Sequence, residues 1–170
     1  MSDYILETVG LCKEFAGFKA VTEVSLRVKR GSIHALIGPN GAGKTTVFNL
    51  LTKFLSASAG SIRFEGVDIT KLVPAKVADL GLVRSFQISA IFPGMSVLEN
   101  VKIGLQKREG LAGCFWRGSG ATTHLDPVAM ALLEQVDLVD SAGSLASDLP
   151  YGKRRSLELA TTLAMEPKVL

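Results

Sequence analysis

The stretch that most constrains this chain is Gly38-Pro39-Asn40-Gly41-Ala42-Gly43-Lys44-Thr45-Thr46. It satisfies G-x-x-x-x-G-K-[ST], the phosphate-binding loop (P-loop) pattern, at every specified position. Glycine at positions 38, 41 and 43 lets the backbone bend through positive φ and approach phosphate oxygens with no Cβ in the way. The amides of residues 41–45 can then point into one concavity that holds an anion. The pattern therefore predicts a site for a phosphorylated ligand.

The side chains of the loop predict a nucleotide with a magnesium ion. Lys44 brings a positive charge to the outer phosphates, and the hydroxyl of Thr45 can bind the metal. The sequence on each side fits the motif, since Ser32–Ile37 reads as a buried strand and an amphipathic helix follows the loop. The expected apolar face of that helix consists of Val47, Leu50, Leu51, Phe54 and Leu55. The expected nucleotide contacts of the loop are Asn40, Gly41, Ala42, Gly43, Lys44, Thr45 and Thr46. The alternative is a glycine-rich turn without a ligand.

Composition places few further limits. With 170 residues, 47% hydrophobic and 21% charged, the chain is long enough for one folded domain or for part of a larger one. No apolar run approaches the ~18 residues that span a bilayer. The two cysteines, Cys12 and Cys114, lack metal-ligand spacing, which is typical of a reducing compartment. The net charge of +3 is scattered over the chain, so a solvated surface is favoured over a nucleic-acid patch.

Strands are expected before and after the P-loop helix. Ile5–Val9 and Glu23–Val28 precede it, with a turn at Ala16-Gly17, and Ser61–Phe64 and Leu82–Phe86 follow it. Phe15, beside the first turn, is placed to stack on a nucleobase, the alternative being a core or hairpin position.

Gln87 follows the strand that we expect at Leu82–Phe86, which in turn follows a helix over Pro74–Leu80 that ends at Gly81. A polar residue at the end of such a strand can hold a metal ion or a metal-bound water, the alternative being a surface position.

Three further segments are expected in the second half of the chain. Ser96 starts a helix to about Leu105, with Glu99 at the capping-box position. Residues 106–124 read as a long loop, whose apolar Leu111, Cys114, Phe115 and Trp116 either meet a partner or pack on the parent domain. Asp126 is the expected N-cap of a helix to about Val136.

The last helix, to about Met165, begins with three cations in its first turn: Lys153, Arg154 and Arg155. The macrodipole is positive there, so carboxylates are the preferred residues. One explanation is an anion bound at this end of the helix, and the other is a solvated basic turn.

These stretches together resemble the nucleotide-binding subunit of ATP-binding-cassette (ABC) transporters. The likeness rests on the P-loop, on Ser85-Phe86-Gln87 and on Leu149-Pro150-Tyr151-Gly152-Lys153, in the family's order. The resemblance implies that Phe15, with Val21 beside it, stacks on adenine, and that Gln87 contacts magnesium and the attacking water. It also implies that Leu149, Pro150, Tyr151, Gly152 and Lys153 form the signature loop, which closes on the γ-phosphate held by a second subunit.

Finer details are similar to the branched-chain amino-acid branch of the family. They are Gly17-Phe18-Lys19-Ala20-Val21, Thr45-Thr46-Val47-Phe48-Asn49, Val83-Arg84-Ser85-Phe86-Gln87 and Tyr151-Gly152. Pro150 departs from the usual signature serine and has neither its hydroxyl nor an N–H. Since that branch often carries Tyr in this loop and tolerates Pro, the resemblance implies a signature loop that is altered in detail and retains its role.

The chain ends at Leu170, where the family begins the strand that carries the Walker B aspartate, and the catalytic glutamate and switch histidine should follow it. We therefore expect a truncated domain, incomplete C-terminally, that binds ATP with little or no hydrolysis. No catalytic residue is assigned.

The resulting expectation for the fold is an α/β P-loop NTPase. It is a partial ABC nucleotide-binding domain over residues 1–170, with a β subdomain, P-loop core and Q-loop at 1–95 and a helical signature subdomain at 96–165.

The expected function is that of the ATP-binding subunit of an ABC importer for branched-chain amino acids, with ATP and Mg²⁺ as cofactors. The expected partners are transmembrane permease subunits and a second ATP-binding subunit in a homo- or heterodimer, with no nucleic acid. The expected place is the cytoplasmic face of the inner membrane, as a peripheral protein. The alternatives are a soluble ABC ATPase that acts on DNA or the ribosome, and a gene fragment without a function.

Overall fold

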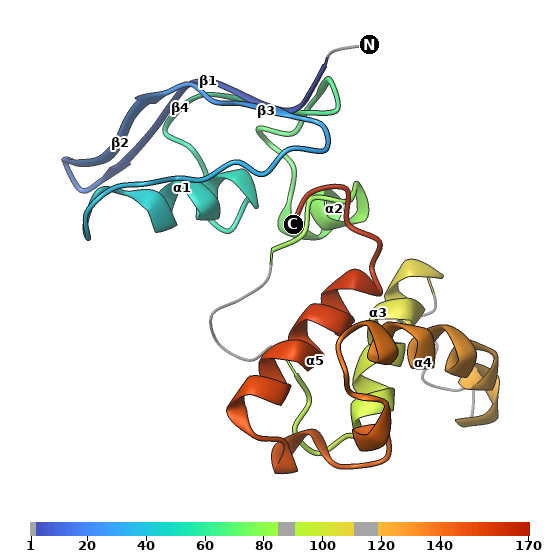
Figure 1. Ribbon diagram of the computed structural model, residues 1–170. Helices are drawn as coiled ribbons and strands as arrows, with labels where there is room; N and C mark the ends of the chain where they lie inside the picture. Colours follow the sequence, from blue (N-terminus) through green and yellow to red (C-terminus); the bar gives the residue numbers. More distant parts are fainter. Residues whose placement is uncertain (1–2, 85–90, 111–118) are drawn as a thin grey trace. The chain divides into compact units, whose positions relative to one another are not determined.

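A computed structural model describes residues 3–84, 91–110 and 119–170 (Figure 1). The chain divides into two compact units, one up to Leu82 with Val169 and one from Val83 to Lys168 with Leu170. In the described part of the chain, no helix is both long and apolar enough to cross a membrane. The proposed subdomain boundary between residues 95 and 96 stays a prediction.

The first unit is an antiparallel sheet with two helices. Its strands are β1 (Tyr4–Phe15), β2 (Phe18–Val24), β3 (Arg27–Lys29), β4 (Ala59–Phe64) and β5 (Val67–Asp68), and its helices are α1 (Lys44–Leu51) and α2 (Pro74–Asp79). The order of the strands is β2-β1-β4-β5, and β3 pairs with β1. Figure 1 shows α1 alongside one face of the sheet. The core between them contains Leu11, Val21, Val47, Leu50, Ile62 and Phe64.

Turn residues explain the two hairpins. Ala16 and Gly17 both have positive φ at the turn between β1 and β2, and Phe15 pairs with Phe18 across it. Glu65 and Gly66 form the corresponding turn between β4 and β5. The predicted turn at Ala16-Gly17 and the predicted strand at Ser61–Phe64 are both confirmed.

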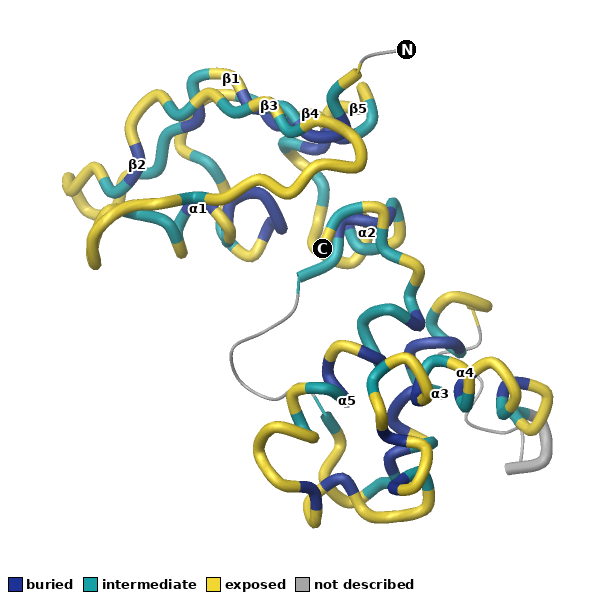
Figure 2. The backbone as a smooth tube through the Cα atoms, in the orientation of Figure 1, coloured by how far each residue is buried: buried dark blue, intermediate teal, exposed yellow. Residues whose placement is uncertain are grey.

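The predicted strand at Ser32–Ile37 is wrong. These residues form no strand, and the isoleucine at position 37 is 92% exposed. In Figure 2 the segment that leads into α1 is exposed along most of its length. A strand is stable only when a neighbour pairs with its N–H and C=O groups, and no described strand pairs with residues 33–37. The β-propensity of these residues was therefore not sufficient to predict a strand in this segment.

Three other boundaries differ from expectation. The strand predicted at Glu23–Val28 is divided between β2, which ends at Val24, and β3, which begins at Arg27. Glu23, with a φ of 48°, lies at a register shift in the pairing of β2 with β1. Helix α1 ends at Leu51, so Phe54 lies beyond it and is half exposed. Of the strand predicted from Leu82, only an isolated bridge between Leu82 and Val169 is seen, and residues 85–90 lie outside the described part.

The second unit is helical. It consists of α3 (Val97–Arg108), η1 (Ser119–Leu125), α4 (Asp126–Gln135), η2 (Val139–Ser141), η3 (Ala146–Asp148) and α5 (Tyr151–Leu163). Its core includes Val101, Leu105, Ala129, Leu133, Leu157 and Ala160. The N-cap of α4 is Leu125 and not the predicted Asp126, because the preceding 3₁₀ turn runs directly into the helix. The predicted loop at 106–124 is shortened at both ends by α3 and η1, and its apolar residues 111–116 lie outside the described part.

Helix α3 carries the capping box predicted from the sequence. The hydroxyl of Ser96 accepts from the Glu99 amide at 3.2 Å, and the Glu99 carboxylate accepts from the Ser96 amide at 2.8 Å. The hydrogen bonds from the backbone amide and then the hydroxyl of Ser96 hold the pKa of Glu99 below its ordinary value of 4.5.

We expect Ser96→Ala to lower the free energy of unfolding by about 1 kcal/mol near neutral pH, since the variant loses the hydroxyl that caps α3. Because the pKa of Glu99 is lowered by folding, its stabilising effect is complete above pH 4.5 and is lost as pH falls through the folded pKa. The difference between variant and parent should therefore shrink in acid, which urea unfolding at several pH values measures. A difference that stays constant with pH would contradict the part assigned to the carboxylate.

Candidate nucleotide-binding site

The N-terminus of α1 is arranged to receive an anion. Its N-cap, Gly43, has a φ of 82° and no side chain, and the first turn contains no acidic residue. The first amides of a helix have no acceptor within it, and the macrodipole makes this end positive. Helix α3 covers the same positions with Ser96 and Glu99, whereas α1 leaves them open.

Lys44 adds a full positive charge at this end. Its Nζ donates to the carbonyl oxygen of Gly38 at 2.6 Å and to that of Pro39 at 2.7 Å. The amide of Ala42 donates to the Pro39 oxygen at 3.3 Å and closes the turn between them. These hydrogen bonds hold the ammonium within the loop that leads into α1, and a positive charge together with open helix amides is the combination that binds phosphate oxygens.

The loop lies directly against β2. A Cβ added to Gly43 would be 2.6 Å from the backbone oxygen of Ala20 and 3.5 Å from a methyl group of Val21. Glycine is therefore required at this position for space as well as for positive φ. Val21 is buried beneath the loop, and its predicted contact with the base stays a prediction.

Phe15 lies at the end of β1, one turn away from β2. Its side chain is 43% exposed, so it has the accessibility that stacking on a base requires. Lys13 Nζ lies 4.9 Å from the centre of the Phe15 ring and donates to the carbonyl oxygen of Ser56 at 2.9 Å. Our sequence reasoning assigned no role to Lys13. The sequence feature that indicates its contact with Phe15 is their separation by two positions, since residues two apart on a strand share one face.

The residues also fit a magnesium ion. Thr45 is an exposed residue in the first turn of α1, next to the open amides. Mg²⁺ is usually held by one or two protein oxygens together with waters and substrate phosphates. The described residues include no cluster of three His, Cys, Asp or Glu that could hold a metal, so such a protein cage is not found in that part. Gln87, the other predicted metal contact, lies outside the described residues.

The predicted signature residues stand at the start of α5, in the second unit. Pro150 is the N-cap, Leu149 is buried, and Tyr151 is 81% exposed in the first turn. The α5 helix, like α1, has neither a side-chain cap nor an acidic residue in its first turn.

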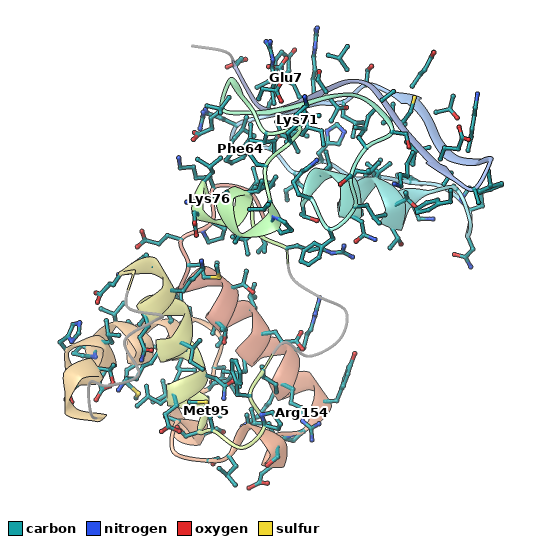
Figure 3. The ribbon with its side chains drawn as sticks, turned by 180° about the vertical axis from the view of Figure 1, so that it is seen from behind. Glu7, Phe64, Lys71, Lys76, Met95 and Arg154 are labelled. Atoms are coloured by element: carbon teal, nitrogen blue, oxygen red, sulfur yellow. The ribbon has the colours of Figure 1, made fainter. Side chains whose placement is uncertain are left out.

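The cations of this turn have protein partners. Arg154, which Figure 3 labels, donates from Nε to the oxygen of Leu149 at 2.7 Å and from Nη2 to that of Ser147 at 2.8 Å. Arg155 pairs with the buried carboxylate of Glu158 at 2.6 Å, and Lys153 Nζ donates to the Ser141 hydroxyl at 3.3 Å. These contacts compensate much of the charge conflict seen in the sequence. An anion at this helix stays a prediction.

The P-loop, Phe15 and Val21 all belong to the first unit, where Val21 lies against Gly43, and residues 149–153 belong to the second.

Comparison with known proteins agrees with a P-loop domain. Residues 21–170 match the family described as ABC transporter. The branched-chain amino-acid transport ATP-binding protein BraF of Pseudomonas aeruginosa is 38% identical over the whole chain, and LivG of Escherichia coli is 37% identical.

Solved structures agree on the fold. The ATP-binding cassette MJ1267 in its ADP conformation matches 98% of the chain with a TM-score of 0.80 and 30% identity. The chain covers 69% of BraF and of LivG and 66% of MJ1267, about two thirds of each. The predicted α/β P-loop fold with an N-terminal antiparallel sheet is confirmed. The family model matches most of this chain, and the relatives match the whole of it. This chain therefore belongs to the ABC transporter family.

Proposed function

We propose that the chain is the ATP-binding part of an ABC importer for branched-chain amino acids. The observation that carries the nucleotide assignment is the open, uncapped N-terminus of α1 with Lys44 bound inside the P-loop. The names of BraF and LivG support the class of solute.

In this proposal Lys44 and those amides of residues 41–45 that have no partner within the loop hold the phosphates, and Phe15 and Val21 lie at the base. Thr45 and Gln87 hold magnesium, which when bound neutralises phosphate charge and orients water. Residues 149–153 contact the nucleotide of a second subunit. The partners are this second subunit and transmembrane permease subunits, and the protein is peripheral on the cytoplasmic face of the inner membrane.

We expect Lys44→Ala to weaken binding of magnesium-ATP by about tenfold or more, because a hydrogen-bonded charge is lost from the phosphate site. Calorimetric titration of the 170-residue chain measures this, with circular dichroism to verify folding. Lys71→Ala, an exposed lysine outside the loop, is the control and should bind as the parent does. Equal affinity of parent and Lys44→Ala would remove the nucleotide assignment.

The class of transporter is tested separately by affinity capture. The tagged chain is co-expressed with the permease subunits of the Pseudomonas aeruginosa branched-chain importer or with those of an unrelated ABC importer. We expect co-purification with the first set, reduced by excess BraF. Capture of neither set, or of both equally, contradicts the branched-chain assignment and leaves nucleotide binding untouched.

A further inference from the structure

The ring of Phe15 is held from one side by a cation that is itself held by the backbone. The Lys13 ammonium lies 4.9 Å from the ring centre, within the ~6 Å at which a cation is attracted to an aromatic face. The same nitrogen donates to Ser56 O at 2.9 Å, so the lysine bridges the ring and the segment that follows α1.

That segment is fastened to β1 by two more hydrogen bonds. The amide of Glu14 donates to the Ser58 hydroxyl at 3.0 Å, and the amide of Ser58 donates to the Cys12 oxygen at 2.9 Å. Lys13 therefore sits between two anchored stretches of backbone. This differs from an ordinary surface lysine, whose ammonium moves freely in water.

We propose that Lys13 is the positioning residue of the nucleobase site, which rests on the nucleotide-binding function proposed above. By occupying one face of the Phe15 ring, the ammonium leaves the opposite face as the stacking surface for the base. It also limits rotation of the ring, so less freedom is lost when a base binds. Lys13 itself touches neither base nor phosphate in this arrangement.

The electrostatics favour an electron-rich base. A cation on one face of an aromatic ring draws electron density toward itself, which makes the other face less negative. A less negative face repels the π-electrons of a stacked base less, and a purine offers a larger stacking area than a pyrimidine. Lys13 thereby supports recognition of the base and has no direct part in holding the phosphates.

The role of Lys13 at the base is tested by comparing the affinities of the 170-residue chain for magnesium-ATP and for magnesium tripolyphosphate, which has no base. Lys13→Met should bind ATP about two- to fivefold more weakly than the parent, the range for a cation–π contact at an exposed site, and tripolyphosphate equally well. Lys13→Arg should restore ATP affinity, since it keeps the charge and a donor. Phe15→Ala should lose about fivefold or more for ATP alone. In its background Lys13→Met should have no further effect.

Lys19→Met is the matched control. Lys19 is an exposed lysine in the same hairpin, paired with Glu14 across the strands, so its removal changes the local charge equally. We expect it to leave the ratio of ATP to tripolyphosphate affinity unchanged. Equal weakening of both ligands by Lys13→Met, or of neither, overturns the proposal, as does an unchanged ratio in Phe15→Ala. If the proposed nucleotide-binding function itself is wrong, the result is a different one: Lys44→Ala binds both ATP and tripolyphosphate with the affinity of the parent.

Discussion

Replacing Gly43 by alanine is expected to lower the free energy of unfolding of the first unit by about 2–4 kcal/mol and to abolish measurable ATP binding. The new Cβ would lie 2.6 Å from the backbone oxygen of Ala20, and Gly43 has a φ of 82°. The collision cannot be relieved by a shift of β2 alone, because Val21, next to Ala20, is packed in the core. A shift of the loop would in turn change the site that binds the phosphates. Urea unfolding followed by circular dichroism and calorimetric titration with magnesium-ATP measure the two effects.

Gly41→Ala is the matched control for backbone strain. Gly41 has a φ of 85°, close to that of Gly43, but a Cβ there would meet no atom within 4 Å. The control variant therefore carries the cost of a left-handed alanine, about 1–2 kcal/mol, without the collision. If both variants lose the same stability, close approach to Ala20 is not what makes glycine necessary at position 43.

Gly104→Ala is expected to destabilise the helical unit by about 2–3 kcal/mol, although alanine ordinarily favours a helix over glycine by about 1 kcal/mol. Gly104 is buried in α3 where that helix meets α5. An added methyl group would lie 2.6 Å from the carbonyl oxygen of Thr161 and 2.8 Å from the Cβ of Ala164. The two helices would have to separate, which opens the core around Leu105 and Leu157. Thermal and urea unfolding of the variant measure the loss.

Gly152→Ala should change the free energy of unfolding in the opposite direction. Gly152 lies in the first turn of α5, and a Cβ there meets nothing within 4 Å. The helix-forming advantage of alanine is then free to act, and we expect stabilisation of up to about 1 kcal/mol. If Gly104→Ala and Gly152→Ala change the free energy of unfolding in the same direction, the close contact between α3 and α5 is not the cause of the loss in Gly104→Ala.

Features set by a few neighbouring residues were predictable from the sequence. Ser96 and Glu99 are three residues apart and satisfy each other's backbone partners, so the capping box was visible without knowledge of the rest of the fold. The same is true of the turn at Ala16-Gly17 and of the P-loop, whose glycines and lysine carry their own geometry.

Features that depend on distant partners were not predictable in this way. Residues 32–37 have the composition of a buried strand, but a strand also needs a neighbour, and composition does not show whether one is there. The cations at the start of α5 looked uncompensated because their partners, such as the Leu149 and Ser147 carbonyls, are recognisable only once the turn before the helix is known. The contact of Lys13 with Phe15 similarly depends on side-chain conformation.

The exposed segment 32–37 also bears on how copies of the chain meet. Its backbone can accept an added strand, and Ile33 and Ile37 present apolar side chains fully to water beside it. An extended segment with these properties is open to edge-to-edge pairing, which natural sheets prevent with charges, proline or a covering element. We therefore expect self-association through this segment, immediately before the nucleotide-binding loop, to compete with the monomer at high protein concentration.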